Sequence, residues 1–321
     1  MATSTKAILG TALLGLLASP TAARAAAGIE VKAAQVYPEG VAYNEKSGEF
    51  LVSSMRKGTI GALKADGKYR EFARDPLLIS AVGLHTDAAR GRLFACVADP
   101  GVALKTGPKT YRKVSRLLVF DLKSGKRLKA IDLQSLAPGE HFCNDIAVAG
   151  AGNAYVTDSL GPFIYKVDPT YKASLFLRSD LFQGANGFNL NGIVHHEGGF
   201  LIVAKSSDGS LWRVPEDTPG VGVHEIALSE KLPNADGLIM TASGDLLVIQ
   251  NAEHRVSRVK STDGWRSAKV DKTLTLEAAF PTTGVEAGGK IYVLLAHLNE
   301  LFENPKTAKS DSFTLTEVSF P

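Results

Sequence analysis

One short motif recurs along the whole chain and constrains its fold more than any other feature. A polar or acidic residue, usually followed by glycine, leads directly into an apolar run, as in Asn191-Gly192-Ile193. The copies begin about 45 residues apart, a period typical of solenoids, propellers and arrays. One interval is longer because a Gly- and Pro-rich insertion occupies residues 100–114. The six copies begin at Glu39, Val82, Asn144, Asn191, Asp236 and Thr283.

Each motif is followed by short apolar or alternating runs that are bounded by turn residues. After Asp236, such runs cover residues 237–242, 246–249 and 255–259. This pattern predicts strands that are joined by hairpins. Three short strands and a weaker outer fourth, repeated six times, predict an all-β, six-bladed β-propeller. A sustained 3.6-residue apolar period, which a helical solenoid requires, does not occur beyond the N-terminus.

Residues 1–25 have the features of a secretory signal peptide. Lys6 supplies a basic start, residues 7–17 are apolar, and Ala23-Arg24-Ala25 provides a small-x-small cleavage site. The apolar run is too short for a membrane span, and no other stretch of the sequence is long enough. We therefore expect a periplasmic or secreted protein whose residues 26–321 form one propeller domain.

The charge balance excludes several classes of partner. The chain has 36 basic and 33 acidic residues, a formal net charge of +3, which is not the pattern of a nucleic-acid or membrane-binding protein. The one basic cluster, residues 105–116, lies in the insertion, where we expect a solvated loop; attraction of an anionic partner is the alternative. We expect a monomer that binds a small molecule and neither nucleic acid nor membrane.

Two further features concern how the blades are held together. Cys96 and Cys143 are the only cysteines. An oxidising compartment permits a bridge between them, but two buried thiols are an equal alternative. Apolar and charged residues alternate within residues 28–36, as they do in a strand. We expect this segment to complete the sixth blade beside residues 313–320, because that pairing removes an exposed sheet edge.

The first residues of the inner strands of a propeller converge near its axis. At that position the chain carries Glu39, Asn144, Asn191 and Asp236. A carboxylate buried there without a partner would cost several kcal/mol, which a cation would offset. Two carboxylates and two amide oxygens suit calcium better than copper or zinc. We predict a central site for one divalent metal ion, calcium favoured; for each dipeptide alone, an ordinary turn is the alternative.

The motifs together resemble the regucalcin (SMP-30)/gluconolactonase/LRE-like family over essentially the whole mature chain. The resemblance implies that Glu39, Asn191 and Asp236 hold the metal, that Asn144 contacts metal or substrate, and that zinc or manganese can replace calcium. The motifs that carry it are Pro38-Glu39-Gly40-Val41, Asn144-Asp145-Ile146, residues 152–158, Asn191-Gly192-Ile193 and Asp236-Gly237-Leu238.

The activity that the resemblance implies is hydrolysis of a lactone or a related ester. A metal would polarise the carbonyl while a carboxylate removes a proton from water, and Asp236 is the candidate base. A ligating carboxylate has a lowered pKa, so His141, three residues before Asn144, is a second catalytic candidate. His85 is a further candidate for the base. For both histidines, a structural role is the alternative.

Two positions depart from the family pattern. Phe142 stands two residues before Asn144, where sugar lactonases tend to have arginine, so a more apolar lactone or ester becomes plausible beside Phe142, Phe163 and Phe188. Phe142 and Asn144 are the predicted substrate contacts. Asp145 matches a second, deeper calcium ligand of the related paraoxonases, but Gly40 does not, which favours one metal.

Two other functions remain open. Residues 141–145 also resemble the royal jelly proteins, so a non-catalytic propeller that binds a ligand or metal is the main alternative. A condensation like that of strictosidine synthase would need a glutamate at the entrance of blade six. Glu300 and Glu303 lie there without an identifying motif.

Overall fold

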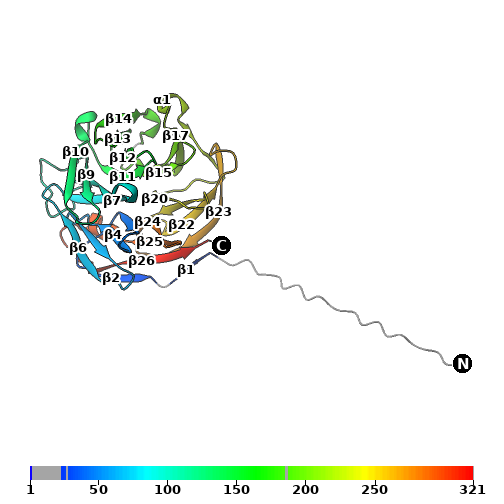
Figure 1. Cartoon of the computed structure of the whole chain (residues 1–321), viewed down its shortest axis with the longest axis horizontal. Coiled ribbons are helices and arrows are strands. Elements are labelled where there is room, and N and C mark those ends of the chain that lie inside the picture. The colour runs from blue at the N-terminus through cyan, green and yellow to red at the C-terminus, as the bar shows by residue number, and fades with distance from the viewer. Residues whose placement is uncertain (2–22, 27, 185–186, 321) are drawn as a thin grey trace.

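Six sheets are arranged as blades around a common centre in the computed structural model (Figure 1). The structure describes residues 1, 23–26, 28–184 and 187–320. The predicted all-β, six-bladed propeller is confirmed over this part of the chain. None of its described helices has the length and apolar character that a membrane span requires. Most of the predicted signal peptide, residues 2–22, lies outside the described residues.

The strands of each blade follow one another from the centre outward, except in blades five and six, which recruit extra strands. In the first three blades they are β3 (Val41–Asn44), β4 (Glu49–Ser53), β5 (Thr59–Leu63) and β6 (Tyr69–Arg74); β7 (Ser80–Asp87), β8 (Arg92–Ala98), β9 (Arg116–Asp121) and β10 (Arg127–Asp132); and β11 (Cys143–Val148), β12 (Ala154–Asp158), β13 (Phe163–Val167) and β14 (Ala173–Arg178). In the others they are β15 (Leu190–His196), β16 (Phe200–Lys205), β17 (Ser210–Pro215) and β18 (His224–Glu225); β20 (Ala235–Met240), β21 (Leu246–Gln250), β22 (Arg255–Lys260), β23 (Ser267–Thr275) and β19 (Ala227–Leu228); and β24 (Pro281–Ala287), β25 (Lys290–Leu295), β26 (Ser312–Ser319), β2 (Ile29–Lys32) and β1 (Arg24–Ala25).

Burial falls from the middle of each blade to its rim. All residues of β8, β12, β16 and β21 are buried, because both faces of each strand pack against neighbouring blades. Strands covered on both faces are near-continuous hydrophobic runs, as Leu246-Leu247-Val248-Ile249 illustrates. The rim strand β10 has one buried residue, Ile131, and is otherwise exposed. The core therefore lies between blades, and the inner strands are left to line the axis.

The ring is closed by strands from both ends of the chain. β2 pairs antiparallel with β26, from Ile29 opposite Leu315 to Lys32 opposite Ser312, which confirms the predicted pairing in blade six. Val31 is fully buried by it. The two-residue strand β1, at the predicted cleavage site, also pairs with β26.

A disulfide joins blades two and three. Cys96 on β8 and Cys143 on β11 are bonded, with their Cα atoms 5.3 Å apart, which is within the usual range for disulfides. The sequence had left this question open. The insertion lies between Cys96 and Cys143 in the chain and connects β8 to β9. It is held to Asp99 by the hydroxyls of Thr106 and Thr110, each at 2.6 Å.

Candidate active site

The recurring motif forms a β-bulge at the start of the inner strands of blades two to six. In β15, Leu190 is opposite Lys205 but Ile193 is opposite Val203, so the inner strand carries one extra residue. Bulges re-aim side chains and often lie beside active sites. The same shift occurs between β7 and β8, β11 and β12, β20 and β21, and β24 and β25.

Glycine follows the polar residue because neighbouring inner strands approach closely there. A Cβ atom on Gly192 would lie 2.3 Å from the backbone oxygen of Asp236, which is too close for any side chain. Blade three differs, because Asp145 takes the glycine position and its Oδ2 accepts a hydrogen bond from the backbone of Ile193 at 3.2 Å. The motif is thus needed for packing around the axis as well as for placing its first side chain.

In blade six the motif begins one residue earlier than predicted. Pro281 is opposite Leu295 and Gly284 is opposite Val293, so Thr282 and Thr283 are the bulged pair. Thr282 is buried, and its hydroxyl donates to the backbone oxygen of Glu39 at 2.9 Å. The predicted start at Thr283 was therefore wrong by one position, because Gly284 occupies the place of the first apolar residue.

The four oxygen-bearing side chains predicted to bind metal line one cavity. Glu39, Asn144, Asn191 and Asp236 come from four blades and are each at least nine-tenths buried. The cavity has a volume of about 300 Å³ and is covered on one side by helix α2 (Leu298–Glu303). Its other lining residues are Met55, Phe142, Phe188, Asn251, Phe280, Leu298, Asn299, Phe302 and Glu303.

Two serines hold the amide side chains in one orientation. Asn144 Nδ2 donates to Ser159 Oγ at 2.7 Å, and Asn191 Nδ2 donates to Ser206 Oγ at 3.0 Å. Each serine hydroxyl donates in turn to the backbone carbonyl just before the next inner-strand motif, so its oxygen accepts from the amide. An amide held by its nitrogen directs its oxygen away from the serine.

Ionisation of the Glu39 and Asp236 carboxyl groups is unfavourable without a cation. Burial raises the pKa of Glu39 well above its usual range, and the nearby carboxylates of Asp236 and Asp145 raise it further. Burial also raises the pKa of Asp236 to about 7, against the lowering effect of hydrogen bonds from Asn251 and Asn191. A cation among them would reverse both shifts.

The donor set fits a hard divalent cation. Glu39 Oε2 and Asn144 Oδ1 are buried and make no hydrogen bond to any residue that the structure describes, although buried polar atoms nearly always have partners. The described residues contain no group of three or more His, Cys, Asp or Glu side chains suited to a metal, as zinc or copper sites often have. Two carboxylates and two amide oxygens are instead the ligand types that calcium accepts.

His141 does not line the cavity. It is buried, with Nδ1 2.9 Å from Asp158 Oδ2 and Nε2 3.1 Å from the backbone oxygen of Ala137. Asp158 Oδ1 also accepts from the backbone nitrogen of Phe142 at 2.8 Å. Because both ring nitrogens are engaged, the geometry favours the structural alternative for His141.

The aromatic residues predicted near the entrance separate into two groups. Phe142 and Phe188 line the cavity, and their ring centroids are 4.8 Å apart. Phe163 is instead buried beside His141, with ring centroids 6.3 Å apart, and is not part of the lining. The prediction that Phe163 lies near the entrance was therefore wrong. The spacing of the motif gives the positions of the inner strands, but Phe163 lies on β13, the third strand from the centre of its blade.

Sequence reasoning missed Asn251 and most of the cavity wall. Asn251 Nδ2 donates to Asp236 Oδ2 at 2.9 Å. A signal for it existed, because Ser159, Ser206 and Asn251 each follow their partner by 15 residues. No comparable signal marks Met55, Phe280 or helix α2, which reach the cavity through loop geometry.

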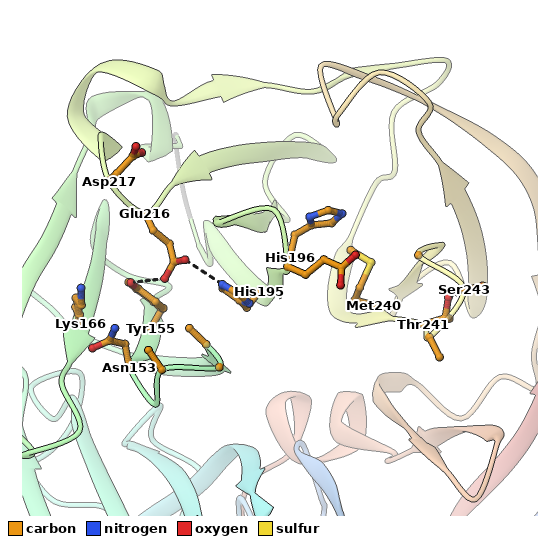
Figure 2. A pocket seen from close by; sticks show the side chains of 16 residues that line it. Asn153, Tyr155, Lys166, His195, His196, Glu216, Asp217, Met240, Thr241 and Ser243 are labelled. Atoms are coloured by element: carbon orange, nitrogen blue, oxygen red, sulfur yellow. Dashed lines mark hydrogen bonds and ion pairs between the residues drawn. The ribbon is translucent and has the colours of Figure 1, made fainter. Parts of the chain in front are cut away.

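A larger cavity, of about 890 Å³, lies at the opposite ends of the inner strands, where β15 ends at His196 and β20 ends at Met240 (Figure 2). Its central polar groups satisfy one another: Glu216 accepts from Tyr155 Oη at 2.7 Å and bonds to His195 Nε2 at 3.0 Å. Two buried oxygens of the predicted metal ligands, Glu39 Oε2 and Asn144 Oδ1, have no partner among the described residues and lie in the smaller cavity, which is therefore the candidate active site.

Comparison with known proteins identifies a family over most of the chain. A model of the SMP-30/gluconolactonase/LRE-like region matches residues 37–297, which include all four predicted metal ligands. No curated protein sequence matches the chain.

Solved structures with low sequence identity share the fold. The major allergen Mala s 1 of Malassezia sympodialis has a TM-score of 0.73 at 18% identity, with 91% of this chain and 96% of that chain covered. Regucalcin from Agrobacterium tumefaciens, a calcium-binding protein, has a TM-score of 0.62 at 19% identity, with 92% of this chain and 95% of that chain covered. A luciferin-regenerating enzyme has a TM-score of 0.64 at 13% identity, with 92% of this chain and 96% of that chain covered.

Proposed function

Because the chain belongs to the SMP-30/gluconolactonase/LRE-like family, we propose that it is a divalent-metal-dependent hydrolase that opens a lactone or cleaves a related ester. The observation that carries this proposal is the convergence of Glu39, Asn144, Asn191 and Asp236 on one cavity, where two of their buried oxygens have no partner in the described part of the chain. These residues would hold one ion, with calcium favoured over zinc or manganese.

The reaction combines one lactone with one water to give one hydroxy acid. The water oxygen bonds to the carbonyl carbon, the ring C–O bond breaks, and a proton passes from the water to the leaving alkoxide. A bound divalent cation supplies Lewis acidity at the carbonyl oxygen. Asp236 would take the proton from water; in support, Asn251 donates to one of its oxygens and fixes the carboxylate's orientation.

Hydrolysis of sugar, homoserine and aromatic lactones and of aryl esters tests this proposal. We expect turnover with calcium, loss of turnover with chelator, and loss of at least about a hundredfold in kcat for Asp236→Ala. Asp217→Asn is the matched control, because it removes an exposed carboxylate from the opposite face. Turnover that survives both chelator and Asp236→Ala would refute the proposal.

A non-catalytic binding propeller is the second candidate. The apolar wall and deep burial of the site suit ligand binding as well as catalysis. Tight calcium binding, measured by titration calorimetry, with no turnover across the panel would establish this alternative.

We also propose that the protein is exported and acts as a monomer on a small molecule. The Cys96–Cys143 disulfide supports export, because such bridges persist in oxidising compartments. Mass spectrometry of the exported protein should give an N-terminus at Ala26; an intact Met1 in the cytoplasm would refute export.

A further inference from the structure

The wall above the four oxygen-bearing side chains is mostly hydrocarbon. Its rings are in contact with one another: Phe142 and Phe188 have centroids 4.8 Å apart, and Phe188 and Phe302 have centroids 6.4 Å apart. These three side chains come from two loops and helix α2. The apolar lining consists of Met55, Phe142, Phe188, Phe280, Leu298 and Phe302.

One of these aromatic residues is held in an unfavourable backbone conformation. Phe280 has a φ of 52°, in the left-handed region that bulky residues rarely adopt. The turn is fixed by hydrogen bonds from Ala296 N to the Phe280 oxygen (3.2 Å) and from His297 N to the Ala279 oxygen (2.9 Å). Strained residues of this kind cluster at functional sites. The fold thus keeps an aromatic side chain in the wall despite its backbone cost.

The amide nitrogens at the base of the cavity are already engaged by protein partners. The amide nitrogens of Asn144, Asn191 and Asn251 donate to Ser159, Ser206 and Asp236 respectively. Apart from the candidate metal ligands and Asn251, the polar side chains among the described lining residues are Asn299 and Glu303, both on α2. A polyhydroxylated ligand would lose hydrogen bonds to water here without replacing them, which disfavours its burial.

We propose that the cavity selects small lactones or esters that carry an alkyl or aromatic group over polyhydroxylated sugar lactones. The carbonyl end lies toward the four oxygen-bearing side chains and the hydrocarbon part lies against the phenylalanines. The volume of about 300 Å³ is at the lower end for small-molecule sites, so the group is short. This inference rests on the proposed hydrolase function, and it makes Phe142, Phe188 and Phe302 determinants of specificity.

Hydrolysis of a γ-lactone series by the calcium-loaded protein tests the inference. With γ-butyrolactone, γ-hexalactone and γ-octalactone, kcat/KM should rise about fourfold per added methylene until the cavity is filled. Glucono-δ-lactone should be at least about a hundredfold poorer than the best of these. Equal or better hydrolysis of glucono-δ-lactone would overturn the inference and leave the hydrolase proposal standing.

A wall variant and a matched control make the test specific. Phe302→Ala should reduce kcat/KM about tenfold for γ-octalactone and less than about twofold for γ-butyrolactone. Leu181→Ala is the control, because Leu181 is also exposed but does not line the cavity. Equal losses on both lactones, or the same loss in the control, would overturn the role of the wall.

Binding separates failure of the inference from failure of the proposed function. Alkyl γ-lactams, which resist hydrolysis, should raise the melting temperature of the calcium-loaded protein, and the rise should grow with chain length. Lactam binding without any lactone turnover would support the apolar site and refute the hydrolase. No rise with the longest lactam would overturn the inference.

Discussion

At the scale of single residues, the site depends on side chains that do not themselves face the cavity. Ser159 and Ser206 fix the amides of Asn144 and Asn191 by accepting from their nitrogens. Partners of metal ligands typically change affinity 10–100-fold when they are removed. The calcium affinity of this protein should therefore depend on residues that make no contact with the ion.

The prediction for Ser206→Ala is a loss of about 10–100-fold in calcium affinity with little loss of fold stability, since the Asn191 amide becomes free to rotate. Titration calorimetry with calcium measures the affinity, and circular dichroism checks the fold. Ser174→Ala, an exposed serine on β14, is the control. Unchanged affinity in Ser206→Ala would contradict the orienting role.

A second prediction follows from the raised pKa of Asp236. Its folded value is about 7, against about 3.9 in an unfolded chain, so the folded state binds the proton more tightly. This group's stabilising effect is full below pH 4, falls as the pH rises toward 7 and is lost above it. Without metal, Asp236→Asn should therefore be more stable than the parent at pH 8, by up to about 4 kcal/mol, and similar at pH 4.

Urea unfolding with chelator, at a series of pH values, measures this difference. With added calcium, the parent should be more stable than Asp236→Asn at pH 8, because only the parent retains the full ligand set. A variant that is less stable than the parent at pH 8 in chelator would contradict the assigned electrostatics.

At the scale of elements, the bulges and the disulfide place neighbouring blades. The bulge on the inner strands of blades two to six turns the first motif residue toward the axis. The Cys96–Cys143 bridge links β8 to β11, directly before Asn144, across a sequence separation of 47. It therefore fixes the strand that carries one of the four site residues.

Removing the bridge by Cys96→Ala with Cys143→Ala should lower the free energy of unfolding by about 2–4 kcal/mol, because the unfolded chain regains loop entropy. Chemical denaturation measures the loss. The parent in strong reductant should behave like the double variant. If reductant has no effect on the parent, the thiols are not bridged in solution.

At the scale of the whole molecule, the ring depends on residues near its N-terminus. A chain that begins at Ala26 loses β1 and keeps β2, so its stability should lie within about 0.5 kcal/mol of that of the full chain. A chain that begins at Tyr37 also loses β2 and the burial of Val31, and leaves the edge of β26 unpaired. It should lose at least about 2 kcal/mol or aggregate.

Denaturant unfolding and size-exclusion chromatography of the two truncated chains check this prediction. Equal stability of both would show that β2 does not close the ring. A large loss on removal of residues 1–25 would assign a structural role to the segment that we propose is cleaved.

The sequence by itself determined the repeat, the blade count, the closing strand and the four side chains at the inner-strand starts. These follow from local rules: turn residues end strands, apolar periodicity gives their burial, and a repeat of fixed length places equivalent residues at equivalent positions. The predicted start in blade six was off by one because Thr283-Gly284-Val285 has the order of the motif, whereas the bulged pair is Thr282 and Thr283.

Only the tertiary structure decided the bridge between Cys96 and Cys143, the engagement of His141 by Asp158, and the wall formed by Phe280 and Phe302. Each depends on the distance between segments far apart in the chain, or on the direction a loop takes. Local sequence preferences do not encode those quantities, because they arise from the packing of one blade against another.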